Sequence, residues 1–107
     1  MSNPPDAEIQ ALLRDLWERH LPSLVERLGV LERTAGEAAS GAIPEESRAE
    51  AQSVAHKLAG NLGMFGHHQA GEIASRIEQT LKAPTPETLA ELVPAVASLR
   101  QCLDGHL

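Results

Sequence analysis

The sequence is poor in aromatic residues, in cysteine and in long hydrophobic runs. Its 107 residues include one Trp, one Phe and no Tyr, and its single cysteine cannot form an internal disulfide. No run of about 18 apolar residues is present, so we expect no membrane span. The N-terminus lacks the basic and apolar pattern of a signal peptide. These absences together predict a cytoplasmic protein.

Positive charge is also scarce. Lys and Arg number 9 against 15 Asp and Glu, which gives a formal net charge of −6. Non-specific nucleic-acid binding needs clustered cations, so this composition argues against a nucleic-acid partner. Metal ligation by cysteine pairs is excluded as well, because Cys102 is alone.

What remains is a chain with 42% apolar residues, most of them recurring at helical spacing. No alternating stretch of strand length occurs, so we predict an all-α fold. The expected architecture is an antiparallel four-helix bundle with a short additional N-terminal helix, formed by residues 1–107 as one domain. Pro22 predicts a break between the first two helices, and Pro94 predicts a kink in the last. The predicted helices cover residues 7–20, 22–39, 45–65, 68–82 and 86–103.

His56 stands out because it lies on the polar face of an amphipathic helix. The apolar face of that helix carries Ala55, Leu58, Leu62 and Phe65. His56 points about 160° from Leu58, and Gly60 and Gly63 lie within about 40° of it. Two glycines inside a helix cost roughly 1 kcal/mol each relative to Ala, which is tolerated where close approach matters. The ring is therefore open to a second protein.

A wider pattern surrounds His56. It consists of Ala55, His56, Leu58, Gly60 and Gly66, followed by the apolar–acidic pair Ile77-Glu78. With this pattern, the stretch from Ala55 to Glu78 resembles the histidine phosphotransfer (HPt) domain of bacterial two-component phosphorelays. The chain departs from the family at Ala59, because the family usually has a lysine three residues after the histidine.

The resemblance implies a phosphoprotein of signal transduction. His56 would accept a phosphoryl group from a receiver-domain aspartyl phosphate and pass it to another receiver aspartate. The implied partners are receiver domains of response regulators or of hybrid histidine kinases. No cofactor is expected on this chain, since the acid cluster and Mg²⁺ would belong to the partner receiver. We expect a monomeric phosphocarrier without autonomous kinase activity, because the sequence has no Gly-rich phosphate loop.

Six residues around His56 are candidates for supporting or docking roles. Gln52, one turn earlier, could hydrogen-bond the ring or a phosphoryl oxygen, and Lys57 could neutralise phosphohistidine. The helix wheel also places Ala59, Gly60, Gly63 and Met64 near the histidine, where they could supply a small docking surface.

Two other hypotheses remain open. The first is a non-catalytic helical docking bundle that binds a kinase or receiver without phosphotransfer, which Ala59 in place of lysine keeps possible. The second is a metal-binding protein using His20, His67 or His68. The spacing of these histidines matches no zinc motif, so we expect no metal site.

Overall fold

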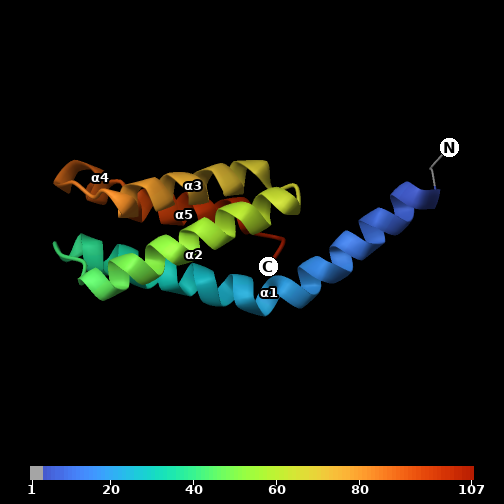
Figure 1. The fold of residues 1–107 in the computed structure, drawn as a ribbon, viewed down its shortest axis with the longest axis horizontal. Coiled ribbons are helices and arrows are strands. Elements are labelled where there is room, and N and C mark those ends of the chain that lie inside the picture. Colours follow the sequence, from blue (N-terminus) through green and yellow to red (C-terminus); the bar gives the residue numbers. More distant parts are fainter. Residues whose placement is uncertain (1–3) are drawn as a thin grey trace.

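In the computed structural model, the backbone is described for residues 4–107 and side chains are described from Asp6 onward. Figure 1 shows the C-terminal part of α1 in a bundle with α2, α3 and α5, while the N-terminal part of α1 projects from this bundle. Within the bundle α1 packs against α2 and α5, and α3 packs against the same two helices from the other side. The described residues contain no strand, which confirms the all-α prediction. None of the described helices could cross a membrane. The helices are α1 (Pro4–Ala39), α2 (Glu45–Met64), α3 (His68–Lys82), α4 (Pro86–Ala90) and α5 (Leu92–Leu103).

The prediction of a separate N-terminal helix was wrong, because α1 continues through Pro22 without a break. Pro22 is exposed, so the carbonyl of Glu18, which loses its helical donor, can hydrogen-bond to water instead. Figure 1 shows α1 changing direction between its projecting and its bundled part. A proline inside a helix produces such a bend.

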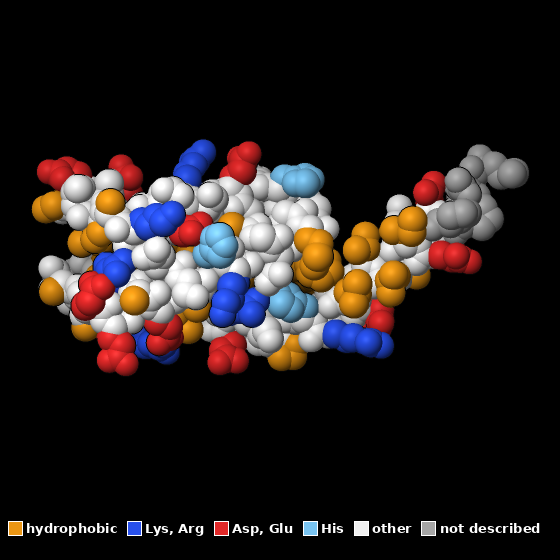
Figure 2. Space-filling model, viewed as in Figure 1, with side chains coloured by type: hydrophobic (Ala, Val, Ile, Leu, Met, Phe, Trp, Pro, Cys, Tyr) orange, Lys and Arg blue, Asp and Glu red, His pale blue; other side chains and the backbone are white. Residues whose placement is uncertain are grey.

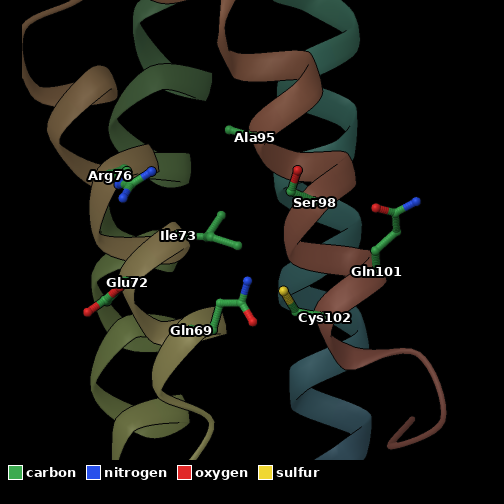
Figure 3. Close-up of a pocket in the computed structure, with 8 residues that line it drawn as sticks. All are labelled: Gln69, Glu72, Ile73, Arg76, Ala95, Ser98, Gln101 and Cys102. Carbon is green, nitrogen blue, oxygen red and sulfur yellow. The ribbon is translucent and has the colours of Figure 1, made fainter.

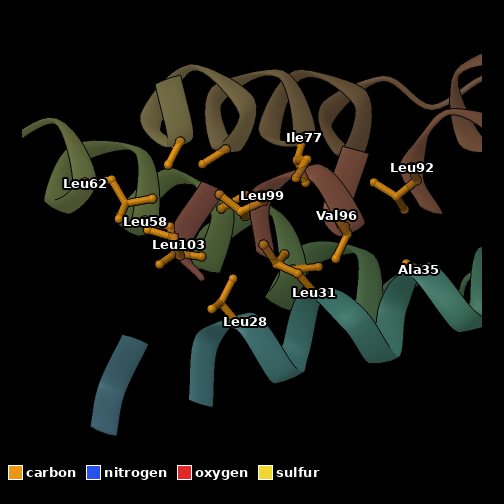
Figure 4. Packing of buried hydrophobic residues seen from close by; sticks show 14 of the residues in the cluster. Leu28, Leu31, Ala35, Leu58, Leu62, Ile77, Leu92, Val96, Leu99 and Leu103 are labelled. Carbon is orange, nitrogen blue, oxygen red and sulfur yellow. The ribbon is translucent and has the colours of Figure 1, made fainter. Parts of the chain in front are cut away.

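The core is made of leucine, alanine and a few β-branched side chains from all four long helices (Figure 4). Its leucines on α1 recur at helical spacing and are at most 1% exposed. The same apolar stripe continues into the projecting part of α1, where Leu12 is 57% exposed. The largest buried side chains are Leu24, Leu28, Leu31, Leu58, Leu62, Ile77, Leu81, Leu92, Leu99 and Leu103.

The last predicted helix is two helices, not one with a kink. α4 ends at Ala90 and α5 begins at Leu92, with the interruption just before Pro94. In a continuous helix the ring of Pro94 would clash with the carbonyl of Ala90, four residues earlier, and the interruption avoids this clash. The predicted start at residue 86 is confirmed: the Thr85 hydroxyl caps α4 by accepting a hydrogen bond from the backbone N–H of Thr88 at 3.1 Å.

α2 and α3 form a tight antiparallel hairpin. Gly66 in the connection has φ +85°, a left-handed conformation that favours glycine. Gly71 on α3 is buried against α2, where a Cβ would lie 3.4 Å from the Ala59 carbonyl oxygen and 3.5 Å from the Gly63 nitrogen. The two backbones therefore approach each other closely, and this fixes how α3 presents its side chains beside α2.

An aromatic cluster closes the end of the bundle near the α2–α3 connection. Trp17 meets Phe65 edge-on with ring centroids 5.2 Å apart, and the His67 ring lies 4.6 Å from Trp17. The indole N–H of Trp17 donates to the backbone carbonyl of His106 at 2.8 Å. This cluster ties the C-terminal segment to α1.

The cluster predicts that the protein loses stability in mild acid through His67. Partial burial, and secondarily the nearby His106, lower the pKa of His67 below its ordinary value of 6.5. As the pH falls, His67 is therefore protonated in the unfolded chain at a higher pH than in the folded protein. The free energy of unfolding should fall as the pH drops below about 6.5, and it should level off once His67 is protonated in the folded protein as well.

Urea unfolding at several pH values measures this loss of stability. His67→Asn should flatten the dependence, whereas the same change at exposed His68 should not; equal pH dependence in both variants would contradict the prediction.

Candidate functional site

His56 lies on the exposed face of α2, as the helix wheel predicted. Its side chain is 73% exposed. Gly60, one turn further on, leaves open space, because no atom lies within 4 Å of a Cβ built there. On this face of the molecule Figure 2 shows His, Lys and Arg side chains gathered over α1 and α2. The imidazole is therefore accessible to another protein.

A carboxylate from α3 holds the ring. Nδ1 of His56 lies 2.9 Å from Oε2 of Glu78, whose side chain is only 12% exposed. An ionised carboxylate can only accept hydrogen bonds, so the pair assigns the proton to Nδ1. In the neutral ring, Nε2 then carries the lone pair. Sequence reasoning noted Glu78 only as the end of a motif and missed this contact, which depends on how the two helices pack.

Gln52 is not bonded to the ring. Its Oε1 accepts a hydrogen bond from Nη1 of Arg48 at 2.7 Å, and the same nitrogen donates to the Leu81 carbonyl at 2.8 Å. Arg48 also donates from Nε to Glu45 at 2.8 Å. Gln52 is thus part of a network that joins α2 to the end of α3, one turn before the histidine.

Comparison with known proteins agrees with this geometry. Residues 8–105 match the Hpt domain family. The chain belongs to the Hpt domain family. It is also 31% identical over 112 residues to Protein RcaC of Microchaete diplosiphon, an alignment that covers 94% of this chain and 16% of that protein. No solved structure matches the chain significantly.

Membership in the Hpt family gives the chain a general role in phosphorelay histidine phosphotransfer. It confirms the resemblance drawn from the residues around His56. The family also implies that the domain interacts with receiver or kinase proteins of two-component systems.

The remaining residues predicted to support or dock at His56 of this Hpt domain differ in their solvent exposure. Lys57 is exposed, whereas Ala59 is half-buried and packs against the core beside α3. Gly63 is half-buried as well, and Met64 is 63% exposed at the end of α2. Met64 borders a shallow pocket of about 280 Å³ that it shares with Leu16 of α1. The exposed apolar surface at the C-terminal end of α2 therefore extends onto α1, which the sequence did not reveal.

A larger cavity of the Hpt domain, about 510 Å³, lies between α3 and α5 and does not include His56 (Figure 3). Its lining is mixed, with Glu72 and Arg76 from α3 and Ser98 and Cys102 from α5. Across the part of the chain that the structure describes, no three His, Cys, Asp or Glu side chains are grouped to hold a metal ion. Within that part, His67 contacts Trp17 and His106.

Proposed function

We propose that His56 accepts a phosphoryl group on Nε2 from a receiver aspartyl phosphate and passes it to another receiver aspartate. The contact between His56 Nδ1 and Glu78 Oε2 carries this proposal. A neutral imidazole is the nucleophilic form of histidine, and a proton held on Nδ1 leaves the Nε2 lone pair free. The 73% exposure of the side chain lets a receiver active site reach that nitrogen.

The transfer exchanges one bond to phosphorus for another. As the N–P bond forms at Nε2, the bond between phosphorus and the aspartyl oxygen breaks, and the aspartate leaves as a carboxylate. The ring keeps its Nδ1 proton and becomes positively charged. The carboxylate of Glu78 stabilises that charge through the existing hydrogen bond, so no large rearrangement is needed. The reverse reaction follows the same path.

The partner completes the site. Phosphoryl transfer depends on positioning and on neutralising the charge of the phosphoryl oxygens, and one histidine with one carboxylate does not supply this. We propose that a receiver domain brings its own acids and Mg²⁺, and that the chain acts as a cytoplasmic phosphocarrier and not as a kinase. Met64 and the exposed apolar side chains near it are the proposed docking surface.

Intact mass spectrometry tests the proposal. The protein is incubated with Mg²⁺ and a panel of phosphorylated receiver domains, beside the variants His56→Gln and His68→Gln. We expect an acid-labile phosphate adduct on the wild type and on His68→Gln, and none on His56→Gln. His68→Gln is the matched control because it also removes an exposed histidine. An adduct on all three proteins would place the phosphoryl group elsewhere.

The same panel separates the proposed role from a docking bundle without phosphotransfer. If a receiver binds the wild type and His56→Gln equally well but no adduct ever forms, the docking role replaces the phosphocarrier role. Calorimetric affinity for the unphosphorylated receivers provides this measurement.

A further inference from the structure

Arg48, on the first turn of α2, reaches across to the end of α3. Its Nη1 donates to the backbone carbonyl of Leu81 at 2.8 Å, a contact between residues 33 positions apart. Leu81 is the last residue but one of α3, so its carbonyl has no N–H donor within that helix. A cation at this end also suits the negative end of the helix dipole. Arg48 therefore supplies, from α2, a C-terminal cap for α3.

Two other side chains of α2 hold the guanidinium in place. Nη1 also donates to Oε1 of Gln52 at 2.7 Å, and Nε donates to Oε2 of Glu45 at 2.8 Å. The Arg48 side chain is only 22% exposed, and these contacts fix its planar fork toward α3. Gln52 lies one turn before His56 on the same face of α2. The network therefore joins the turn before the histidine to the end of α3.

Glu78 lies beside this cap. It is three residues before Leu81, or about 4.5 Å along the helix axis. Another close contact between α2 and α3 is at Gly71, seven residues before Glu78, or about 10 Å along the axis. The last turn of a helix frays when its terminal carbonyls have no partner. Of these two contacts, the Arg48 cap is therefore the one that keeps the turn carrying Glu78 in place.

We propose that Arg48 is a positioning residue that holds Glu78 at His56, and its effect on transfer rests on the proposed function. By capping α3, Arg48 keeps the Glu78 carboxylate 2.9 Å from Nδ1 of His56 and so keeps the proton on that nitrogen. Without the cap, the last turn of α3 frays and the carboxylate leaves the ring for part of the time. A misplacement of about 1 Å can slow a reaction by about 100-fold.

The test combines NMR of the His56 ring with transfer rates from a phosphorylated receiver, both on the full chain. At about pH 8, where histidine is mostly neutral, ¹⁵N spectra give the fraction of rings with the proton on Nδ1. Arg48→Met removes the donors but keeps an apolar stem. We expect it to lower this fraction and to slow transfer by about tenfold, less than complete loss of the carboxylate would.

Two control variants accompany Arg48→Met. Arg48→Lys should recover part of both effects, because an ammonium group can still donate to the Leu81 carbonyl. Arg33→Met removes an arginine that pairs with Glu50 of α2, with Nη2 and Oε1 3.4 Å apart, and does not join α2 to α3. It should change neither the tautomer nor the rate.

A double-mutant cycle shows whether Arg48 acts through Glu78. In the Glu78→Ala background, Arg48→Met should slow transfer no further, because the carboxylate that Arg48 holds is already absent. An equal slowing in both backgrounds would overturn the assignment and give Arg48 a separate role.

A second result would also overturn the assignment. An Arg48→Met protein with the tautomer and the rate of the wild type would show that the cap only stabilises the fold. If the wild type accepts no phosphoryl group from any receiver, the proposed function fails, and the NMR comparison alone then decides whether Arg48 positions Glu78. Circular dichroism ensures that folded proteins are compared. If Arg48→Met does not fold, Arg48→Gln, whose side chain is too short to reach α3, takes its place with the same expected results.

Discussion

Replacing Glu78 with alanine is expected to slow phosphoryl transfer to His56 by about 100-fold, the size typical of a positioned acid–base group. The change removes the carboxylate that accepts a hydrogen bond from the Nδ1–H group, whose nitrogen lies 2.9 Å from Oε2. The ring would then rotate freely and populate both tautomers, and the positive charge formed during transfer would lose its partner. Rapid-quench measurement of transfer from a phosphorylated receiver gives the rate.

Two further variants show which property of Glu78 matters. Glu78→Gln keeps an acceptor oxygen but removes the charge, so we expect an intermediate rate. Glu72→Ala removes an exposed carboxylate from the same helix and should leave the rate unchanged. A Glu78→Ala protein that transfers as fast as the wild type would show that the contact only holds α2 and α3 together.

Replacing Leu58 with alanine is expected to lower the free energy of unfolding by about 2–5 kcal/mol. Leu58 is fully buried on the inner face of the helix that carries His56. Truncation leaves a cavity that the surrounding helices fill only in part. Since domains of this size are stable by about 5–15 kcal/mol, the variant should unfold at a clearly lower urea concentration.

Leu12→Ala is the matched control for this measurement. Leu12 is 57% exposed on the projecting part of α1, so its truncation should change stability by less than about 0.5 kcal/mol. A comparable loss in both variants would mean that the exposed stripe of α1 is covered in solution.

The sequence predicted the elements in which local signals agree. The range of α3 was predicted as it is found, and α2 ends one residue earlier than expected. Their apolar spacing, the glycine between them and the prolines before α2 and α4 all point to the same boundaries. The exposure of His56 followed from the same spacing, because only one face of α2 is apolar.

The errors arose where tertiary context decides the outcome. A proline in the sequence does not show whether the carbonyl that loses its helical hydrogen bond can be hydrated instead. At Pro22 the helix continues because the position is exposed to water. From the sequence, Gln52 was the only residue named as a possible partner of the ring, and Glu78 was not considered for that role. The packing of α3 against α2 brings Glu78 to His56, while Gln52 is bonded to Arg48.

The ring and its carboxylate partner lie within one hairpin of consecutive helices, only 22 residues apart in the chain. Contacts of such short sequence separation close small loops, which costs little chain entropy and favours rapid formation. α2 and α3 can therefore orient His56 as soon as their own interface forms, before α5 has packed against α1. In a folding experiment, the histidine site would belong to the early structure, and the docking of the chain ends to the late structure.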